Sequence, residues 1–256
     1  MTDGPNPRRS AEVRVDELAP AERLIVALDV PSAAEARRVV AAVGEAATTY
    51  KVGKELFTAE GPDLVRELVN SGRRVFLDLK FHDIPNTVAG AVRSAAGLGV
   101  SMLTLHAAGG RGMLEAAVEA ARGMAKPPLL LAVTVLTSLR DADLRETGVA
   151  GDAQKQVLRL ARLARAAGCG GVVASPLEIA ELRRELGPGM VIVTPGVRPA
   201  GSAAGDQGRV ATPAEAVAAG ASHVVVGRPI LEAADPNLAA REILQEIASG
   251  LAQRRH

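Results

Sequence analysis

Residues 24–32 of the chain read Leu-Ile-Val-Ala-Leu-Asp-Val-Pro-Ser, an apolar run that ends on an aspartate and is followed by a proline. A continuous apolar run is typical of a parallel strand that is covered on both faces. An open, doubly wound sheet that binds a dinucleotide would carry a glycine-rich phosphate loop directly after this strand. Residues 29–32 contain no glycine, so the stretch favours a closed (β/α)8 barrel over the open sheet.

Seven further β-rich runs follow, and alanine- and leucine-rich amphipathic runs separate them. The predicted strands are 24–29, 48–52, 74–80, 100–106, 129–135, 170–174, 190–194 and 223–227. The predicted helices are 33–44, 62–71, 87–98, 112–125, 153–167, 177–186, 213–219 and 237–252. Single (β/α)8 barrels commonly have about 250 residues. We therefore expect an α/β fold with one TIM-barrel domain over residues 23–256, preceded by an N-terminal extension over residues 1–22.

The composition excludes several classes of function. The 30 basic and 29 acidic residues give a net charge of +1, which provides no field for binding nucleic acid. Three phenylalanines and one tyrosine are too few to form a broad platform for stacking single-stranded bases. The single cysteine, Cys169, rules out an intramolecular disulfide framework, which suits a cytoplasmic protein. No apolar stretch approaches the ~20 residues of a membrane helix.

Charged residues gather where the predicted strands end, and barrel enzymes hold their reactive groups at those ends. Asp29 ends the first strand, Lys51 lies near the end of the second, and Asp78 and Lys80 end the third. Because side chains alternate along a strand, Asp78 and Lys80 share one face. We expect these four residues to form an array of opposite charges at the barrel mouth. A purely structural network of buried ion pairs is the alternative.

The array also constrains the chemistry. Carboxylates next to Lys80 favour its ammonium form, which suits a proton donor better than a Schiff-base nucleophile. Asp83 lies an odd number of positions from Asp78 and beyond the strand end, so we expect it to point elsewhere, across a subunit boundary. The four histidines show no spacing typical of metal ligands, and we expect no metal site.

A second cluster of candidates follows the seventh and eighth predicted strands. Loops at these positions bind phosphate in many barrels. Gly227 would let the backbone approach a phosphate, and the planar guanidinium of Arg228 would donate to its oxygens. The alternatives are a simple tight turn for Gly227 and a solvated surface charge for Arg228.

Taken in order, these segments resemble the bacterial orotidine 5′-phosphate decarboxylases. The resemblance covers residues 24–231, and its most specific part is the ten-residue block Asp-Leu-Lys-Phe-His-Asp-Ile-Pro-Asn-Thr at 78–87. The other matching segments are 27–29, 51–53, 105–107, 133–138, 194–199, 206–207 and 225–230. The resemblance implies the last step of de novo UMP biosynthesis, in which orotidine monophosphate (OMP) loses CO2 without a metal or cofactor.

The resemblance also implies a role for each matching residue. Lys80 would protonate C6 of the pyrimidine, Asp78 would lie against the departing carboxylate, and Asp83 of a second subunit would lie beside it. Further contacts would come from residues on both subunits of a homodimer: Lys51 and Asp29 to the ribose, Ile84 and Thr87 across the interface, Thr137 to the pyrimidine edge, Pro195 and Arg198 from the loop after the seventh strand, Gln207 between base and phosphate, and Gly227 and Arg228 to the phosphate.

Two other functions are compatible with parts of the pattern. A hexulose-phosphate synthase or a related sugar-phosphate decarboxylase shares the Asp-x-Lys-x-x-Asp core, but these relatives use Mg²⁺ and carry an acidic residue on the second strand. Lys51 stands in that region here, which argues against the metal. The second alternative is a non-catalytic barrel that binds a phosphoribosyl ligand. The complete set of Lys80 and its partner aspartates argues against it.

Overall fold

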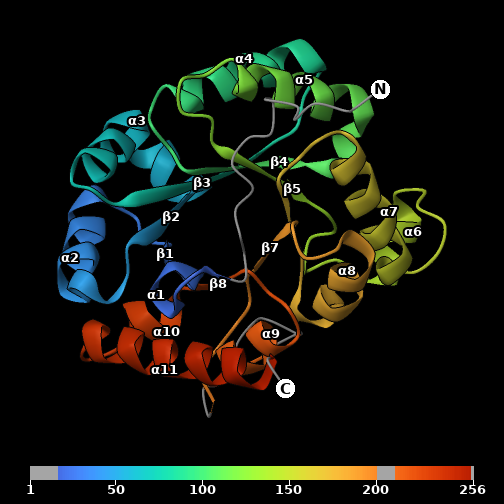
Figure 1. Ribbon diagram of the computed structural model, residues 1–256. Helices are drawn as coiled ribbons and strands as arrows, with labels where there is room; N and C mark the ends of the chain where they lie inside the picture. Colours follow the sequence, from blue (N-terminus) through green and yellow to red (C-terminus); the bar gives the residue numbers. More distant parts are fainter. Residues whose placement is uncertain (1–16, 201–210, 255–256) are drawn as a thin grey trace, which may run out of the picture.

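A computed structural model of the chain describes residues 17–200 and 211–254 and shows a closed barrel surrounded by helices (Figure 1). Each strand pairs in parallel with the next along the chain, and β1 closes the ring on β8. The strands are β1 (Leu24–Leu28), β2 (Thr49–Gly53), β3 (Arg74–Phe81), β4 (Met102–His106), β5 (Leu129–Val133), β6 (Gly171–Val173), β7 (Val191–Thr194) and β8 (His223–Val226). The predicted TIM barrel is confirmed, and each strand ends within two residues of its predicted bounds.

Helices cover the outside of the barrel on all sides (Figure 1). The longer ones are α2 (Ala33–Val43), α3 (Lys54–Asn70), α4 (Pro85–Ala96), α5 (Gly110–Arg122), α7 (Ala153–Ala166), α8 (Ile179–Leu186) and α11 (Pro236–Arg254). Shorter ones are α1 (Pro20–Arg23), α6 (Asp141–Glu146), α9 (Pro213–Ala218) and α10 (Arg228–Leu231). No helix in the described ranges is long and apolar enough to cross a membrane.

The predicted helix start at residue 62 is wrong, because α3 begins at Lys54. The two halves of this helix meet at Gly61, whose φ of 68° and ψ of −162° are not helical. Pro62 then occupies the first turn of the second half, where a missing N–H does no harm. The proline therefore marks a real helix start, but one that lies inside a longer element.

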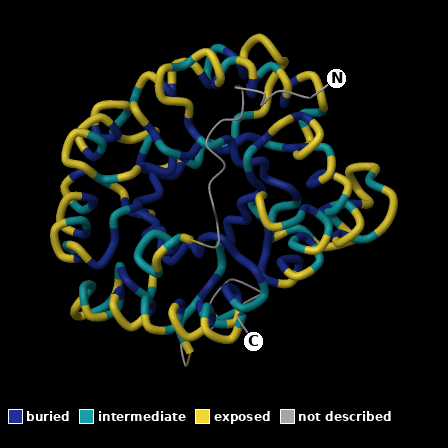
Figure 2. Tube along the Cα trace, viewed as in Figure 1, coloured by how far each residue is buried: buried dark blue, intermediate teal, exposed yellow. Residues whose placement is uncertain are grey.

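Two apolar layers hold the fold together, and side-chain alternation assigns each strand residue to one of them. In β1, Leu24, Val26 and Leu28 face the helices, whereas Ile25 and Ala27 face the barrel axis. The inner layer is small and consists of Ile25, Ala27, Phe76, Met102, Leu131, Val191, Val193 and Val225. Figure 2 shows the result: the strands are buried, and exposure is concentrated on the outer surfaces of the helices.

The last residues of the predicted extension lie at the bottom of the barrel. Residues 17–19 lead into α1 there, and the Glu22 carbonyl in α1 accepts a hydrogen bond from His223 Nδ1 at 2.9 Å. Arg23, the last residue of α1, is wholly buried. Residues 1–16 lie outside the part of the chain that the structure describes.

Candidate active site

Four charged side chains meet at the carboxyl ends of the first three strands. Lys51 Nζ lies 2.7 Å from Asp29 Oδ1 and 4.0 Å from Asp78 Oδ2. Lys80 Nζ lies 2.8 Å from both carboxylate oxygens of Asp78. The four groups therefore form a continuous row in which positive and negative charges alternate. We call this row the charge array; its members are Asp29, Lys51, Asp78 and Lys80.

The charge array runs from solvent into the barrel. The side chain of Asp29 is 58% exposed, whereas those of Lys51 and Asp78 are 11% and 14% exposed. Lys80 lies between these values at 25%. Charges that are shielded from water interact strongly, and removal of one partner leaves the other without compensation. The inner part of the array is therefore the place where a bound ligand would feel these charges most.

The strand that carries Asp78 and Lys80 is irregular. Its pairing with β4 runs from Leu77 opposite Leu103 to Phe81 opposite Leu105, so four steps on β3 match two steps on β4. Lys80 lies inside this bulge with a φ of 54°, the left-handed region that residues other than glycine rarely adopt. Such a conformation costs about 1–3 kcal/mol and persists only where the surrounding structure holds it.

Thr104 on β4 is a site residue that the sequence analysis missed. It is wholly buried, and its hydroxyl accepts a hydrogen bond from the Lys80 backbone N–H and donates one to Asp78 Oδ1, both at 2.9 Å. A signal was present: Thr104 lies two positions before His106, so alternation places its polar side chain on the same inner face.

Two glycines lie close to the charge array at the mouth. A Cβ on Gly53, the last residue of β2, would lie 3.0 Å from Lys51 Nζ and 3.3 Å from Asp29 Oδ1. A Cβ on Gly227, which follows β8, would lie 3.8 Å from Asp29 Oδ2. The predicted phosphate-binding turn at Gly227 and Arg228 thus lies next to the outer end of the charge array, across the β8–β1 junction.

Most of the remaining predicted residues fall into two groups. Thr137, Pro195 and Arg198 are half-buried in the segments that follow β5 and β7, and the Arg198 N–H donates to the Ala211 carbonyl at 3.0 Å. Gln207 lies outside the described residues. Asp83, Ile84 and Thr87 are exposed at the entrance to α4.

The structure of one chain does not bring this last group into the charge array. Ile84 is 66% exposed, and Asp83 Oδ1 accepts a hydrogen bond from the Ile84 N–H.

His106 ends β4 near the charge array, and its ring lies 5.4 Å from that of His82. Burial lowers the pKa of His106, and the positive charges of His82, Lys54 and Lys80 lower it further. A neutral imidazole is therefore expected at pH 7, which suits hydrogen bonding better than charge pairing. Within the described ranges, no three His, Cys, Asp or Glu side chains are grouped as metal ligands.

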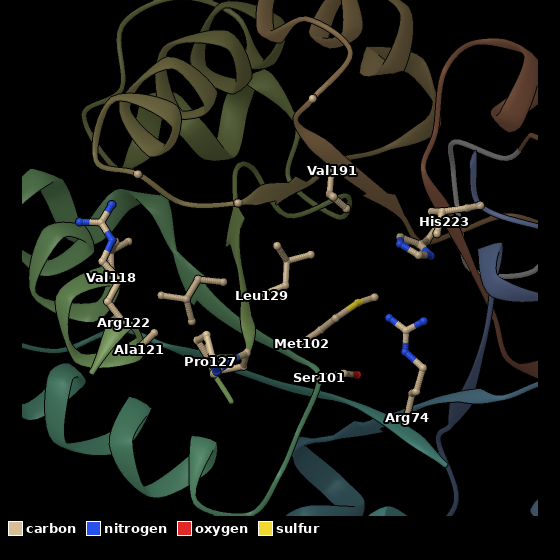
Figure 3. Close-up of a pocket in the computed structure, with 16 residues that line it drawn as sticks. Arg74, Ser101, Met102, Val118, Ala121, Arg122, Pro127, Leu129, Val191 and His223 are labelled. Carbon is tan, nitrogen blue, oxygen red and sulfur yellow. The ribbon is translucent and has the colours of Figure 1, made fainter. Parts of the chain in front are cut away.

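A separate cavity of about 440 Å³ opens at the opposite end of the barrel. Figure 3 shows Arg74 and His223 beside it, with Met102, Leu129 and Val191 along its walls. These residues come from the first positions of their strands, and none of the predicted site residues is among them. Burial lowers the pKa of His223 to about 4.

Comparison with known proteins relates the whole barrel to one family. The family model described as "Orotidine 5'-phosphate decarboxylase / HUMPS family" matches residues 22–243, which include all eight strands and the complete charge array. The chain belongs to this family.

Individual relatives agree with this assignment. The chain is 58% identical over 227 residues to an orotidine 5′-phosphate decarboxylase from Halorhodospira halophila, covering 89% of this chain and 96% of that protein. A second orotidine 5′-phosphate decarboxylase, from Moorella thermoacetica, is 56% identical over 88% of this chain and 92% of its own length. The crystal structure of orotidine 5′-phosphate decarboxylase from Lactobacillus acidophilus superposes with a TM-score of 0.80 at 39% identity, covering 88% of this chain and 99% of that one.

Proposed function

We propose that this chain is an orotidine 5′-phosphate decarboxylase that converts OMP to UMP and CO2, the last step of UMP biosynthesis, without a metal or cofactor. The observation that carries the proposal is the charge array, in which a carboxylate that is only 14% exposed lies against an ammonium group at the barrel mouth. The family match and the relatives at 56–58% identity support the same activity.

Asp78 and Lys80 carry out the central step. The substrate carboxylate at C6 enters beside Asp78, and the two negative charges repel each other. Loss of CO2 relieves this repulsion: the bond between C6 and the carboxyl carbon breaks, and its electron pair stays on C6. Lys80 Nζ then transfers a proton to that carbon and regains one from solvent. Because the ammonium is already in place, it stabilises the developing charge with little reorganisation.

Lys51 distinguishes this activity from the Mg²⁺-dependent chemistry of hexulose-phosphate synthases and related decarboxylases. Those relatives carry an acidic residue on the second strand. Here an ammonium group occupies that region, 2.7 Å from Asp29 and 4.0 Å from Asp78. A divalent cation placed between the same aspartates would be repelled by this charge. Lys51 instead fixes the array, and with Asp29 it binds the ribose.

The phosphate and the base are bound by residues outside the charge array. Gly227 and Arg228 bind the phosphate, Gln207 joins phosphate to base, and Thr137 contacts the pyrimidine edge. Pro195 and Arg198 complete the substrate contacts from the segment after β7. Binding energy from these distant contacts offsets the unfavourable approach of the substrate carboxylate to Asp78.

We further propose a cytoplasmic homodimer in which each active site is shared. Asp83, Ile84 and Thr87 are exposed in one chain, although the resemblance assigns all three to the substrate site. An isoleucine that is 66% exposed suits burial against a second copy. In the dimer, Asp83 joins Asp78 beside the substrate carboxylate, and Thr87 reaches the ribose.

The activity is tested by incubating the purified chain with OMP and, separately, with a 3-keto hexulose phosphate. We expect UMP and CO2 to form in equal amounts from OMP, and the sugar phosphate to remain. Turnover of the sugar phosphate alone would refute the proposed reaction.

Site sharing is tested by mixing two inactive variants, Lys80→Ala and Asp83→Ala, under conditions of proven subunit exchange. A mixed dimer with shared sites contains one site that has both wild-type residues and one that has neither. We therefore expect activity to return on mixing. A mixture that stays inactive although mixed dimers are present would contradict sharing.

A further inference from the structure

Thr104 is a polar residue in an otherwise apolar strand interior. Its neighbours Leu103 and Leu105 pack outward against the helices, and Met102 belongs to the inner layer. A hydroxyl that is wholly buried needs hydrogen-bond partners in the protein, because these replace the hydrogen bonds to water that it loses on burial. Both partners of Thr104 are parts of the charge array.

The first partner is the strained backbone of β3. The bulge between Leu77 and Phe81 interrupts the ladder with β4, so the N–H of Lys80 loses the carbonyl that a regular strand would supply. The Thr104 hydroxyl accepts that N–H at 2.9 Å. This bond satisfies the donor and holds Lys80 in its left-handed conformation, which determines where the side chain leaves the strand.

The second partner is the carboxylate of Asp78. Its Oδ1 accepts from both Thr104 and Lys80 Nζ. Lys80 gives up its proton in the proposed reaction, and the hydrogen bonds from Lys80 Nζ to Asp78 then lose their charge assistance and weaken. Thr104 is neutral and keeps its hydrogen bond throughout, so the carboxylate keeps its orientation while the proton moves.

We propose that Thr104 is a positioning residue for decarboxylation: its hydroxyl joins the Lys80 backbone to the Asp78 carboxylate and thereby fixes the proton donor relative to the reacting carbon. The inference rests on the proposed function. Beyond that function, a residue on β4 is assigned to orient two catalytic residues on β3.

The test compares Thr104→Val, which keeps the shape but lacks the hydroxyl, with Thr104→Ser, which keeps the hydroxyl. For the valine variant we expect kcat to fall about 10–100-fold, because a small misplacement of a reacting group can cost about 100-fold in rate. The KM for OMP and the affinity for UMP should stay close to wild type, because the lost interaction acts on the chemical step. The serine variant should recover most of kcat.

Thr134→Val, one residue after the end of β5, is the matched control. Thr134 is also buried, and its hydroxyl donates to the Val173 carbonyl at 3.0 Å, outside the charge array. This variant also loses a buried hydroxyl, although the Val173 carbonyl still accepts from the Thr134 N–H. It should therefore lower the melting temperature no more than Thr104→Val does, and leave kcat near wild type. If Thr104→Val does not fold, Thr104→Cys offers a smaller change with a weak donor, and the same loss of kcat is expected.

Three outcomes would overturn the proposal: a Thr104 variant without the hydroxyl that keeps wild-type kcat, equal losses of kcat in the Thr104 and Thr134 variants, or a serine variant no better than valine. A wild-type protein that does not consume OMP would instead refute the proposed function.

Discussion

Cationic side chains are hydrogen-bonded at both ends of the barrel, and backbone carbonyls take a much larger part at the bottom. At the mouth, Lys51 and Lys80 are paired with carboxylates. At the bottom, Arg23 donates to the backbone carbonyls of residues 18, 221 and 222, and Arg183 donates to those of residues 187, 188, 190 and 220. His223 likewise donates to the carbonyl of Glu22.

This difference suggests that the mouth of the barrel serves function and the bottom serves stability. Backbone carbonyls cannot change their charge or move far, so the bottom fastens α1 and the loops to the strands whatever the mouth binds. Carboxylates and ammonium groups can exchange protons and respond to a charged ligand. In barrels, catalytic residues lie at the carboxyl ends of strands, and the opposite face serves stability. Three changes, ordered by the size of the expected effect, test whether this division holds here.

The largest effect is expected at the mouth, for Lys80→Ala. Loss of the proton donor should reduce kcat by at least about 10³-fold. The affinity for UMP should remain, since the proposed phosphate and ribose contacts involve other residues, and the melting temperature should change little because Lys80 is partly exposed. Steady-state kinetics, calorimetry of UMP binding and thermal melting measure the three quantities. A variant with near wild-type kcat would remove Lys80 from the reaction.

The second effect is expected at the bottom and depends on pH. Burial depresses the pKa of His223 to about 4, whereas an unfolded histidine has a pKa of about 6.5. The unfolded chain therefore binds the proton first, so this stabilisation is complete above pH 6.5 and is lost as the pH falls through 4. The contribution amounts to about 3 kcal/mol.

Urea unfolding of wild type and His223→Asn between pH 7 and pH 4 measures this contribution. The asparagine can still donate to the Glu22 carbonyl but does not titrate, so its stability should depend less steeply on pH. The value of kcat at pH 7 should be the same for both proteins. Identical pH profiles of stability would show that His223 is not held neutral, and a loss of kcat would show that the two ends are not independent.

The smallest effect is expected for Gly53→Ala at the mouth. The added methyl group would lie 3.0 Å from Lys51 Nζ, at the end of a flexible side chain that can shift. We expect a rise of a few-fold in the KM for OMP, since we propose that Lys51 and Asp29 contact the ribose, with little change in melting temperature. An unchanged KM would mean that the outer half of the charge array tolerates displacement.

Much of this division was predictable from sequence. Parallel strands covered on both faces are continuous apolar runs, so their ends were found within two residues, and charged residues such as Asp29 and Asp78 stood at those ends. Alternation placed Asp78 and Lys80 on one face correctly, but it assumes a regular strand. The bulge and the left-handed Lys80 follow from pairing with β4, which no local pattern reveals.

Other features of the structure also depend on contacts that a local sequence pattern does not show. Thr104 escaped notice because a threonine is common in any strand, and only its two partners give it a role. The first half of α3 was missed because the Gly61 and Pro62 pair resembles a helix start. The roles of Asp83, Ile84 and Thr87 concern a second chain, so they rest on the resemblance.

The central claim is that the side chains of the charge array, without a metal ion, perform the decarboxylation. Its most direct test is the initial rate of OMP consumption by the purified protein in excess EDTA, compared with the rate in excess Mg²⁺. We predict equal rates and complete conversion to UMP under both conditions. A rate that disappears in EDTA and returns with Mg²⁺ would contradict it.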